Sequence, residues 1–171
     1  SMPDASGLLA VLTYRVRDEF GWGEAKTLTA STLDAWDPAI AVDGTGAAHV
    51  VYTISPDWDT KTLEYRRVAA DAPQPLTTTL NDRSYYLGLA ASADGTVHVA
   101  FGRLLDGNMD LFYLRGRDGV FAPEQRVTDT PALDETSPAI ALDKDGRPVV
   151  SFVENLSAAP AGKVYVAFPG D

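Results

Sequence analysis

The chain has 171 residues, of which 45% are apolar, and it carries a formal net charge of -10. This composition is typical of a globular protein with one sizeable hydrophobic core and argues against a disordered chain. The acidic balance argues against nucleic acid or an anionic membrane surface as a partner, because both would repel the chain. Cysteine is absent, which excludes disulfides, thiolate metal sites and thiol catalysis.

The N-terminal part is predicted to hold a partial strand pair. We expect residues 1–7 to be a tag remnant and a flexible N-terminus, without the basic segment of a signal peptide. In residues 8–33, Leu12-Thr-Tyr-Arg15 precedes a turn with Trp22 and a strand that ends at Leu28-Thr29. No apolar run in the sequence approaches the roughly 18 residues of a membrane-spanning helix, so we expect no membrane span.

An internal repeat is the strongest pattern in the sequence. Residues 40–52, 89–101 and 140–152 align without gaps, at a period of about fifty residues. Each copy shares a glycine at one offset and an aromatic residue at its end, namely Gly46 and Tyr52, Gly95 and Phe101, and Gly146 and Phe152. Each copy is therefore predicted to be a β-hairpin, in which the glycine supplies the positive φ of a tight turn.

A second strand pair follows each of the first two hairpins. Leu63-Glu-Tyr-Arg66 and Leu111-Phe-Tyr-Leu114 repeat the pattern that begins at Leu12. Four strands of ~6 residues with short connections account for a period of about fifty residues. Such units are typical of β-propeller blades, whereas a sandwich does not repeat its strand sequences at a fixed spacing.

We therefore predict an all-β fold, a β-propeller of four-stranded antiparallel blades. Its parts are a partial blade at 8–33, blades at 34–84 and 85–134, and a partial blade at 135–171, about three to three and a half blades in all. Closed propellers have about four to eight blades, so the chain cannot easily close alone. We expect a homo-oligomer, with a dimer of roughly six blades favoured, or a fragment of a longer propeller.

The repeat resembles that of the bacterial sialidase-like, or Asp-box, propellers. The pattern Ser-Pro-x-Ile-Ala-x-Asp-x-x-Gly is best developed within residues 137–152, and degenerate Asp-box turns run from Asp118 to Phe121 and from Asp18 to Trp22. The resemblance implies that Phe121 and Trp22 are wedged between blades and that Asp118 ties its turn. It also favours an extracytoplasmic or secreted location. The family includes hydrolases, lectins and scaffolds.

The features of a sialidase are missing. The family's sialidases use three arginines, a Tyr–Glu pair and an Asp acid, but no Arg-Ile-Pro motif stands near the start of this sequence. Its arginines fall mostly in the predicted third strands, far from the axis. We therefore expect binding rather than catalysis, with no catalytic residue, no metal and no cofactor.

Aromatic and acidic residues gather in the loops that a propeller places on one face around its axis. Aromatic rings stack on sugars, and carboxylates and amides bond hydroxyl groups, so a neutral carbohydrate is the expected ligand. The alternative is that the aromatic residues seal the loops and the acids are merely solvated. The candidate ligand-binding residues are Trp36, Asp37, Asp57, Trp58, Asp59, Arg83, Tyr85, Tyr86, Asp106, Asn108, Asp134 and Glu135.

Two further patterns are expected to be structural. His49 and His98 hold equivalent positions in two repeats and are predicted to be packed rather than metal ligands. The run from Asp143 to Gly146 matches the start of a calcium loop but is predicted to be a hairpin turn, because Glu154 lies a whole strand away. The function expected is a lectin-like binding module. The alternatives are a glycan-cleaving enzyme or a fragment of one, and an assembly scaffold or engineered repeat protein.

Overall fold

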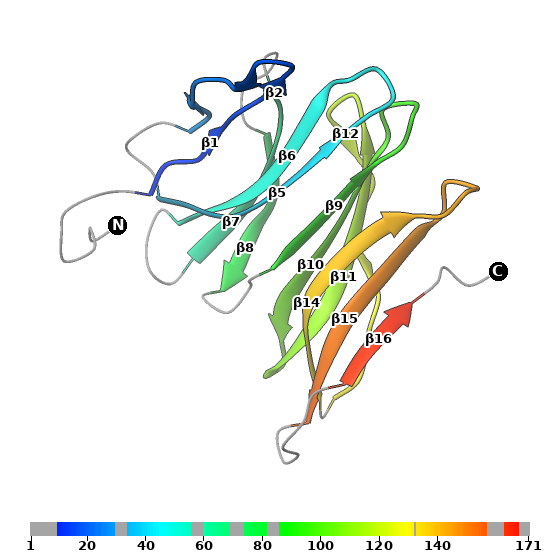
Figure 1. Cartoon of the computed structure of the whole chain (residues 1–171). Coiled ribbons are helices and arrows are strands. Elements are labelled where there is room, and N and C mark those ends of the chain that lie inside the picture. Colours follow the sequence, from blue (N-terminus) through cyan, green and yellow to red (C-terminus); the bar gives the residue numbers. More distant parts are fainter. Residues whose placement is uncertain are drawn as a thin grey trace.

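The computed structural model describes residues 10–29, 34–55, 60–68, 74–81, 86–131, 133–156 and 163–167. Within these ranges every regular element is a β-strand, and the strands form antiparallel sheets (Figure 1). The all-β fold that the sequence predicts is confirmed. In this part of the chain, no helix has the length and apolar character to cross a membrane.

Four short strands make up what we call the N-terminal strand pair. Strand β1 pairs with β4, and β2 pairs with β3, so the segment folds back on itself as one interrupted hairpin. Their bounds are β1 (Thr13–Tyr14), β2 (Arg17–Asp18), β3 (Gly21–Trp22) and β4 (Lys26–Thr27).

Three larger antiparallel sheets follow along the chain. The first sheet contains β5 (Asp34–Val42), β6 (Ala48–Ser55), β7 (Thr60–Arg67) and β8 (Gln74–Asn81) in this order. The second contains β9 (Leu87–Ala91), β10 (Val97–Leu105) and β11 (Asn108–Arg117), and both β12 (Val120–Phe121) and β13 (Gln125–Arg126) pair with β11. The third contains β14 (Leu133–Leu142), β15 (Pro148–Leu156) and β16 (Lys163–Ala167).

The three predicted hairpins are confirmed as β5–β6, β9–β10 and β14–β15. Their tight turns contain Gly46, Gly95 and Gly146, with φ values of 85°, 84° and 78°. These turns lie at one end of the sheets, which we call the turn face. The β10–β11 turn and the starts of β5, β9 and β14 lie toward the opposite end, the loop face (Figure 1).

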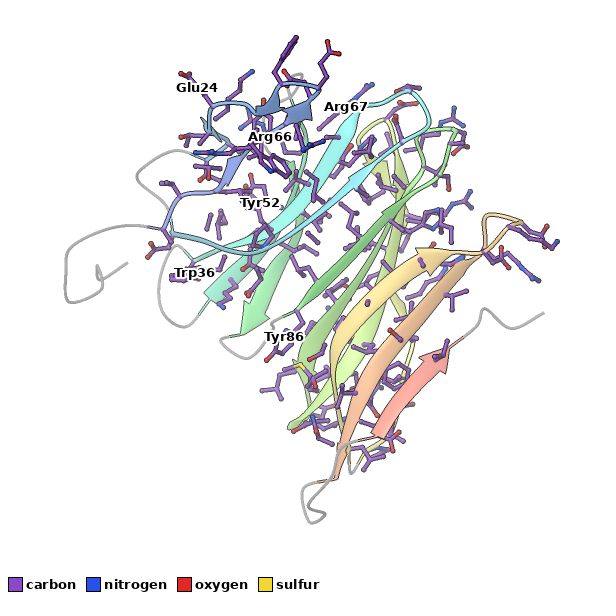
Figure 2. The ribbon with its side chains drawn as sticks, viewed as in Figure 1. Glu24, Trp36, Tyr52, Arg66, Arg67 and Tyr86 are labelled. Carbon is purple, nitrogen blue, oxygen red and sulfur yellow. The ribbon has the colours of Figure 1, made fainter. Side chains whose placement is uncertain are left out.

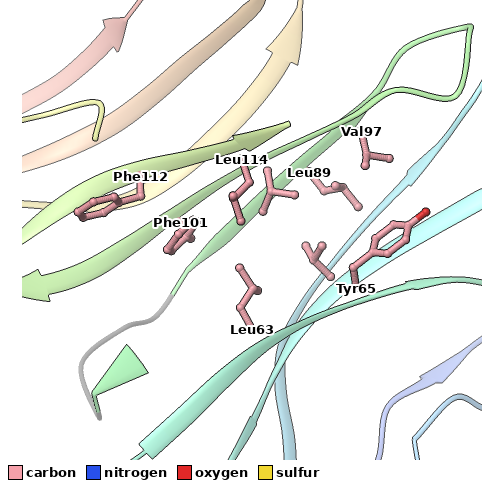
Figure 3. Packing of buried hydrophobic residues seen from close by; sticks show 9 residues of the cluster. Leu63, Tyr65, Leu89, Val97, Phe101, Phe112 and Leu114 are labelled. Carbon is pink, nitrogen blue, oxygen red and sulfur yellow. The ribbon is translucent and has the colours of Figure 1, made fainter. Parts of the chain in front are cut away.

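The sheets stand side by side and pack through apolar side chains. Between the first and second sheets, Val51, Leu63 and Tyr65 meet a cluster of the second sheet that includes Val99 and Phe101 (Figure 3). Between the second and third sheets, Ala100 and Leu111 pack with Val150 and Phe152. Successive residues of β10 from Val97 to Gly102 are buried on both faces, and most of them are apolar, as expected for a sheet enclosed by two others.

The degenerate Asp-box turns differ from one another. Phe121 is wedged between sheets as expected, with its ring edge-on to Tyr65 at 5.2 Å between centroids. The expectation for Trp22 is wrong, because this side chain is 66% exposed. For Asp118, the contact found is an ion pair with the neighbouring residue rather than a tie across its turn. Its carboxylate pairs with Arg117 at 3.7 Å, and its side chain is 83% exposed.

Candidate functional site

A cavity of about 260 Å³ lies where the innermost strands of the three sheets begin. We call it the axial pocket. The three sheets contribute equivalent residue pairs to its lining, namely Asp37 and Pro38, Tyr86 and Leu87, and Ser137 and Pro138. The repeat therefore brings one position of each sheet around a common axis. Two of the predicted ligand residues, Asp37 and Tyr86, meet in this pocket.

The pocket is built from residues in a strained backbone conformation. Asp37, Tyr86 and Ser137 have φ values of 51°, 73° and 53°, although none of them is glycine. The strand registers of β5 and β14 also shift at this point, which marks a β-bulge. Such a conformation costs roughly 1–3 kcal/mol per residue and persists where the surroundings enforce it, often at ligand sites. The axial pocket is thus preorganised.

Asp37 lines this pocket, and its side chain is partly buried. Its Oδ2 atom is buried and has no hydrogen-bond partner among the described residues, and the buried Lys61 Nζ lies 4.0 Å away. This covered oxygen therefore faces Lys61 rather than a ligand in the pocket.

One exposed aromatic residue lines the pocket, and a second precedes a lining residue in the sequence. Trp36 and Tyr86 are 49% and 51% exposed, and both lie toward the loop face, away from Arg67 (Figure 2). Trp36 immediately precedes Asp37, and Tyr86 lines the pocket itself. The site therefore combines aromatic surface, one carboxylate and one hydroxyl residue, Ser137.

Three other predicted ligand residues lie outside the axial pocket. Asp106 is exposed in the tight β10–β11 turn, where its φ is 53°. Asn108 donates from Nδ2 to the carbonyl oxygens of Thr130 and Leu133 at 3.4 and 3.5 Å. Asp134 accepts the backbone N–H of Met109 through Oδ1 at 2.8 Å. Asn108 and Asp134 thus join segments of the fold and do not line the axial pocket.

Glu135 points inward. It is fully buried and accepts hydrogen bonds from the hydroxyls of Thr128, at 3.1 Å, and Thr130. Burial raises the pKa of Glu135, and the nearby Asp110 and Glu154 raise that pKa further, against the two hydroxyl bonds that lower it. Its carboxylate is not presented to a ligand at the surface.

Asp110 is a buried acid that the sequence analysis did not single out. Its Oδ2 pairs with Arg126 Nη2 at 2.6 Å, whereas its buried Oδ1 has no hydrogen-bond partner within the described part of the chain. Asp110 directly precedes the apolar run Leu111-Phe-Tyr-Leu114, and a single acid at the start of such a run does not indicate whether its side chain is buried. Five further predicted site residues lie outside the described residues, namely Asp57, Trp58, Asp59, Arg83 and Tyr85.

The two histidines lie on the turn face and tie strands together. His49 bonds Tyr65 Oη through Nδ1 at 2.7 Å and Asp43 Oδ2 through Nε2 at 3.1 Å. His98 makes the equivalent contacts with Tyr113 and Ser92, also at 2.7 and 3.1 Å. Both are packed residues, as predicted. No group of described residues is arranged to hold a metal ion.

Charges on the turn face are held by local hydrogen bonds. The Thr45 hydroxyl and then His49 hold the pKa of Asp43 far below its usual range. Burial, together with the charge of Arg115, lowers the pKa of His98. Asp143 accepts the backbone N–H groups of Asp145 and Arg147 at 2.8 and 2.9 Å, so this turn is the ordinary hairpin turn that was predicted.

Comparison with known proteins gives likeness in structure but not in sequence. No protein-family model matches the chain, and no curated protein matches it. The endo-arabinase of Bacteroides thetaiotaomicron superimposes with a TM-score of 0.58 at 14% identity, over 92% of this chain and 65% of its own. TolB of Acinetobacter baumannii gives a TM-score of 0.58 at 15% identity, over 93% of this chain and 35% of its own.

A fucose lectin from Kordia zhangzhouensis, solved with methyl-fucoside, superimposes with a TM-score of 0.52 at 14% identity. That match covers 78% of this chain and 93% of the lectin chain. These proteins are β-propellers, so the chain has a β-propeller fold. At such identities the likeness is one of fold. The chain spans less than two thirds of the endo-arabinase and about a third of TolB.

Proposed function

We propose that the chain is a non-enzymatic carbohydrate-binding module with its site at the axial pocket. The observation that carries this proposal is the convergence of three strained, equivalent residues, Asp37, Tyr86 and Ser137, on one cavity. The structural neighbours lend support, since they include a lectin solved with methyl-fucoside and an endo-arabinase. The likeness of residues 137–152 to sialidase-like propellers is part of the same proposal.

The chemistry of the pocket suits a small neutral sugar. Its volume of about 260 Å³ is below the range of roughly 300–1,000 Å³ that drug-sized ligands occupy, so one sugar ring or a chain end fits better than a long segment. Tyr86 and Trp36 offer rings for stacking. Asp37 and Ser137 offer hydrogen bonds to hydroxyl groups.

The lining of the pocket favours binding over hydrolysis. Glycoside hydrolysis usually needs two carboxyl groups that flank the scissile bond. Among the described residues that line the axial pocket, Asp37 supplies one carboxylate, and the others are Pro, Tyr, Leu and Ser. The buried acids Asp110 and Glu135 are fully covered.

A glycan array followed by titration calorimetry tests the proposal. We expect Trp36→Ala and Tyr86→Ala each to weaken the best sugar about fivefold to tenfold, because an aromatic contact contributes about 1 kcal/mol. Phe20→Ala is the matched control, since this ring is 90% exposed on the distant N-terminal strand pair. Equal weakening by the control, or release of sugar that Asp37→Asn abolishes, would contradict a non-enzymatic site at this pocket.

A further inference from the structure

Two pockets on the turn face are equivalent in the repeat but differ in how they are closed. The pocket between the first and second sheets, of about 310 Å³, is lined by Tyr65 and also by Asp118 and Gly119 of the β11–β12 turn. The pocket between the second and third sheets, of about 490 Å³, is lined by Tyr113, and no β11–β12-like turn of a neighbouring sheet lines it. Among the described residues, the second pocket is the larger and has no such turn in its lining.

An aromatic ring closes the first of these pockets. Phe121 follows the β11–β12 turn and packs edge-on against Tyr65. Its ring lies over Gly116, where a Cβ atom would come within 2.5 Å of it. In the second pocket, Tyr113 takes the place of Tyr65, because the register pairs Tyr65 with Val51 and Tyr113 with the equivalent Ala100. Within the described part of the chain, no ring takes the place of Phe121 beside Tyr113.

The N-terminal strand pair carries this counterpart. Trp22 pairs with Arg17 as Phe121 pairs with Gly116. The segment also repeats a hydrogen bond of the second sheet, since Leu12 N donates to Thr29 Oγ1 as Leu111 N donates to Thr128 Oγ1, both at 2.9 Å. Yet Trp22 is 66% exposed. In the ranges that the structure describes, the pocket at Tyr113 is therefore not closed by an aromatic ring, and the ring of Trp22 is not packed in such a pocket.

The innermost strands of the first and third sheets also carry exposed apolar side chains that would fit one another. Ile40 and Val42 of β5 are 58% and 60% exposed, whereas Leu89, the equivalent of Ile40, is 9% exposed. The third equivalent, Ile140, packs against Gly88, where a Cβ would lie 3.2 Å from Ile140 Cγ2. The residue that corresponds to Gly88 in the third sheet is Ala139, which is exposed, as is Ala141.

We propose that a second copy of this chain completes the third sheet. The N-terminal strand pair of the second copy joins β15 as the outer strands, and its Trp22 enters the 490 Å³ pocket above Tyr113. Ile40 and Val42 of the second copy then pack on Ala139 and Ala141, as Ile140 packs on Gly88 within the chain. The contacts between copies therefore repeat those between the sheets of one chain.

The proposal requires an exchange at the edge of β15. Strand β16 pairs with β15, and the paired residues run from Val150 with Ala167 to Glu154 with Lys163. It occupies the edge of β15 that corresponds to the edge of β10 on which β11 pairs. The incoming strands β1 and β2 replace β16 there. Two copies exchanging both ways make a closed ring of six sheets, whereas three copies would exceed the usual range of about four to eight. The ring adds a second set of Asp37, Tyr86 and Ser137 to the axis.

Solution mass, measured by light scattering on the chain, tests this assembly without any sugar. We expect the mass of two chains. Trp22→Ala and Ile40→Lys should each weaken the dimer roughly tenfold or more, as substitutions at central interface positions do. Both side chains are exposed in the single chain, so neither substitution removes a buried contact there. Val120→Lys, at a side chain that is 76% exposed on the turn of the second sheet, should leave the mass unchanged.

Cross-linking identifies the faces that meet. The chain has no cysteine, so Ile40→Cys and Ala139→Cys can be made in separate chains, mixed and oxidised. We expect a mixed disulfide between them, because at the equivalent positions within the chain a Cβ atom on Gly88 would lie 3.2 Å from Ile140 Cγ2, close enough for two cysteines to reach one another. Ala139→Cys with Val120→Cys should give none. A single-chain mass at high concentration, a mass of three or more chains, or a dimer that neither Trp22→Ala nor Ile40→Lys weakens would overturn the proposal.

Discussion

Among individual residues, Glu135 and Asp110 stand out because they are acids at fully buried positions. The segments that contain these two acids have equivalents near the N-terminus. Asp134 accepts the backbone N–H of Met109, and Asp34 accepts that of Ala10 in the same way, both at 2.8 Å. At the positions equivalent to Asp110 and Glu135 the N-terminal segment has Val11 and Ala35. The fold therefore does not require acids there.

The raised pKa of Glu135 makes stability depend on pH. Between the ordinary and the raised pKa, the folded chain binds more protons than the unfolded chain, so stability falls as pH rises through this window. Glu135→Gln cannot ionise. Its oxygen can accept from the Thr130 hydroxyl, and its amide N–H can donate to the Thr128 hydroxyl oxygen. We expect the variant to be about 1 kcal/mol more stable than the parent at pH 7, the scale of one buried hydrogen bond, and no more stable at pH 4. Urea unfolding at both pH values measures this, and a less stable variant at pH 7 would contradict it.

Among the elements, close contact between neighbouring sheets depends on small residues at the hairpin turns. A Cβ atom on Gly44 would lie 2.5 Å from the backbone oxygen of Ala93, which is the equivalent position in the next turn. Backbone atoms cannot rotate away as a side chain can. The first and second sheets therefore approach one another only because residue 44 lacks a side chain.

Gly44→Ala should accordingly destabilise the chain by about 1–3 kcal/mol, as overpacking does. Lys144→Ala is the matched control, because Lys144 holds the equivalent position in the third sheet and its side chain is 87% exposed. Thermal unfolding of both variants measures the difference. Equal stability of Gly44→Ala and the parent would show that the sheets do not meet at this contact.

The sequence predicts the hairpins well because their signal is local. Glycine at a fixed offset in each repeat indicates positive φ, and Gly46, Gly95 and Gly146 adopt it. The positive φ of Tyr86 could not be predicted, because a bulky residue rarely adopts it. That of Asp37 could not be predicted either, because aspartate tolerates it but more often adopts other conformations. Neighbouring side chains of a strand point to opposite faces, so Asp134 is exposed while Glu135 is buried, a distinction that loop composition cannot make.

The error at Trp22 has a physical cause beyond its own turn. A wedged aromatic needs a neighbouring sheet, and the repeat indicates the wedge without saying which sheet receives it. Arg17 also stands where Gly116 makes room for Phe121, so Trp22 cannot fold over its own strand in the same way. The position is equivalent, but its surroundings are not.

For the whole molecule, the two ends of the sheets have different roles. On the turn face, His49, His98 and the hairpin turns hold the strands through local hydrogen bonds. On the loop face, the innermost strands are strained around the axial pocket, and the exposed Tyr86 lines it. We therefore propose the axial pocket as the place where a sugar binds.

Nuclear magnetic resonance titration of the labelled chain with the best sugar from the array tests this claim most directly. We expect the backbone amides of Asp37, Tyr86 and Ser137 to shift together and to saturate at one concentration, while Gly46, Gly95 and Gly146 on the turn face stay unchanged. Shifts confined to the turn-face glycines, or no shifts at the axial pocket at saturating sugar, would contradict the claim.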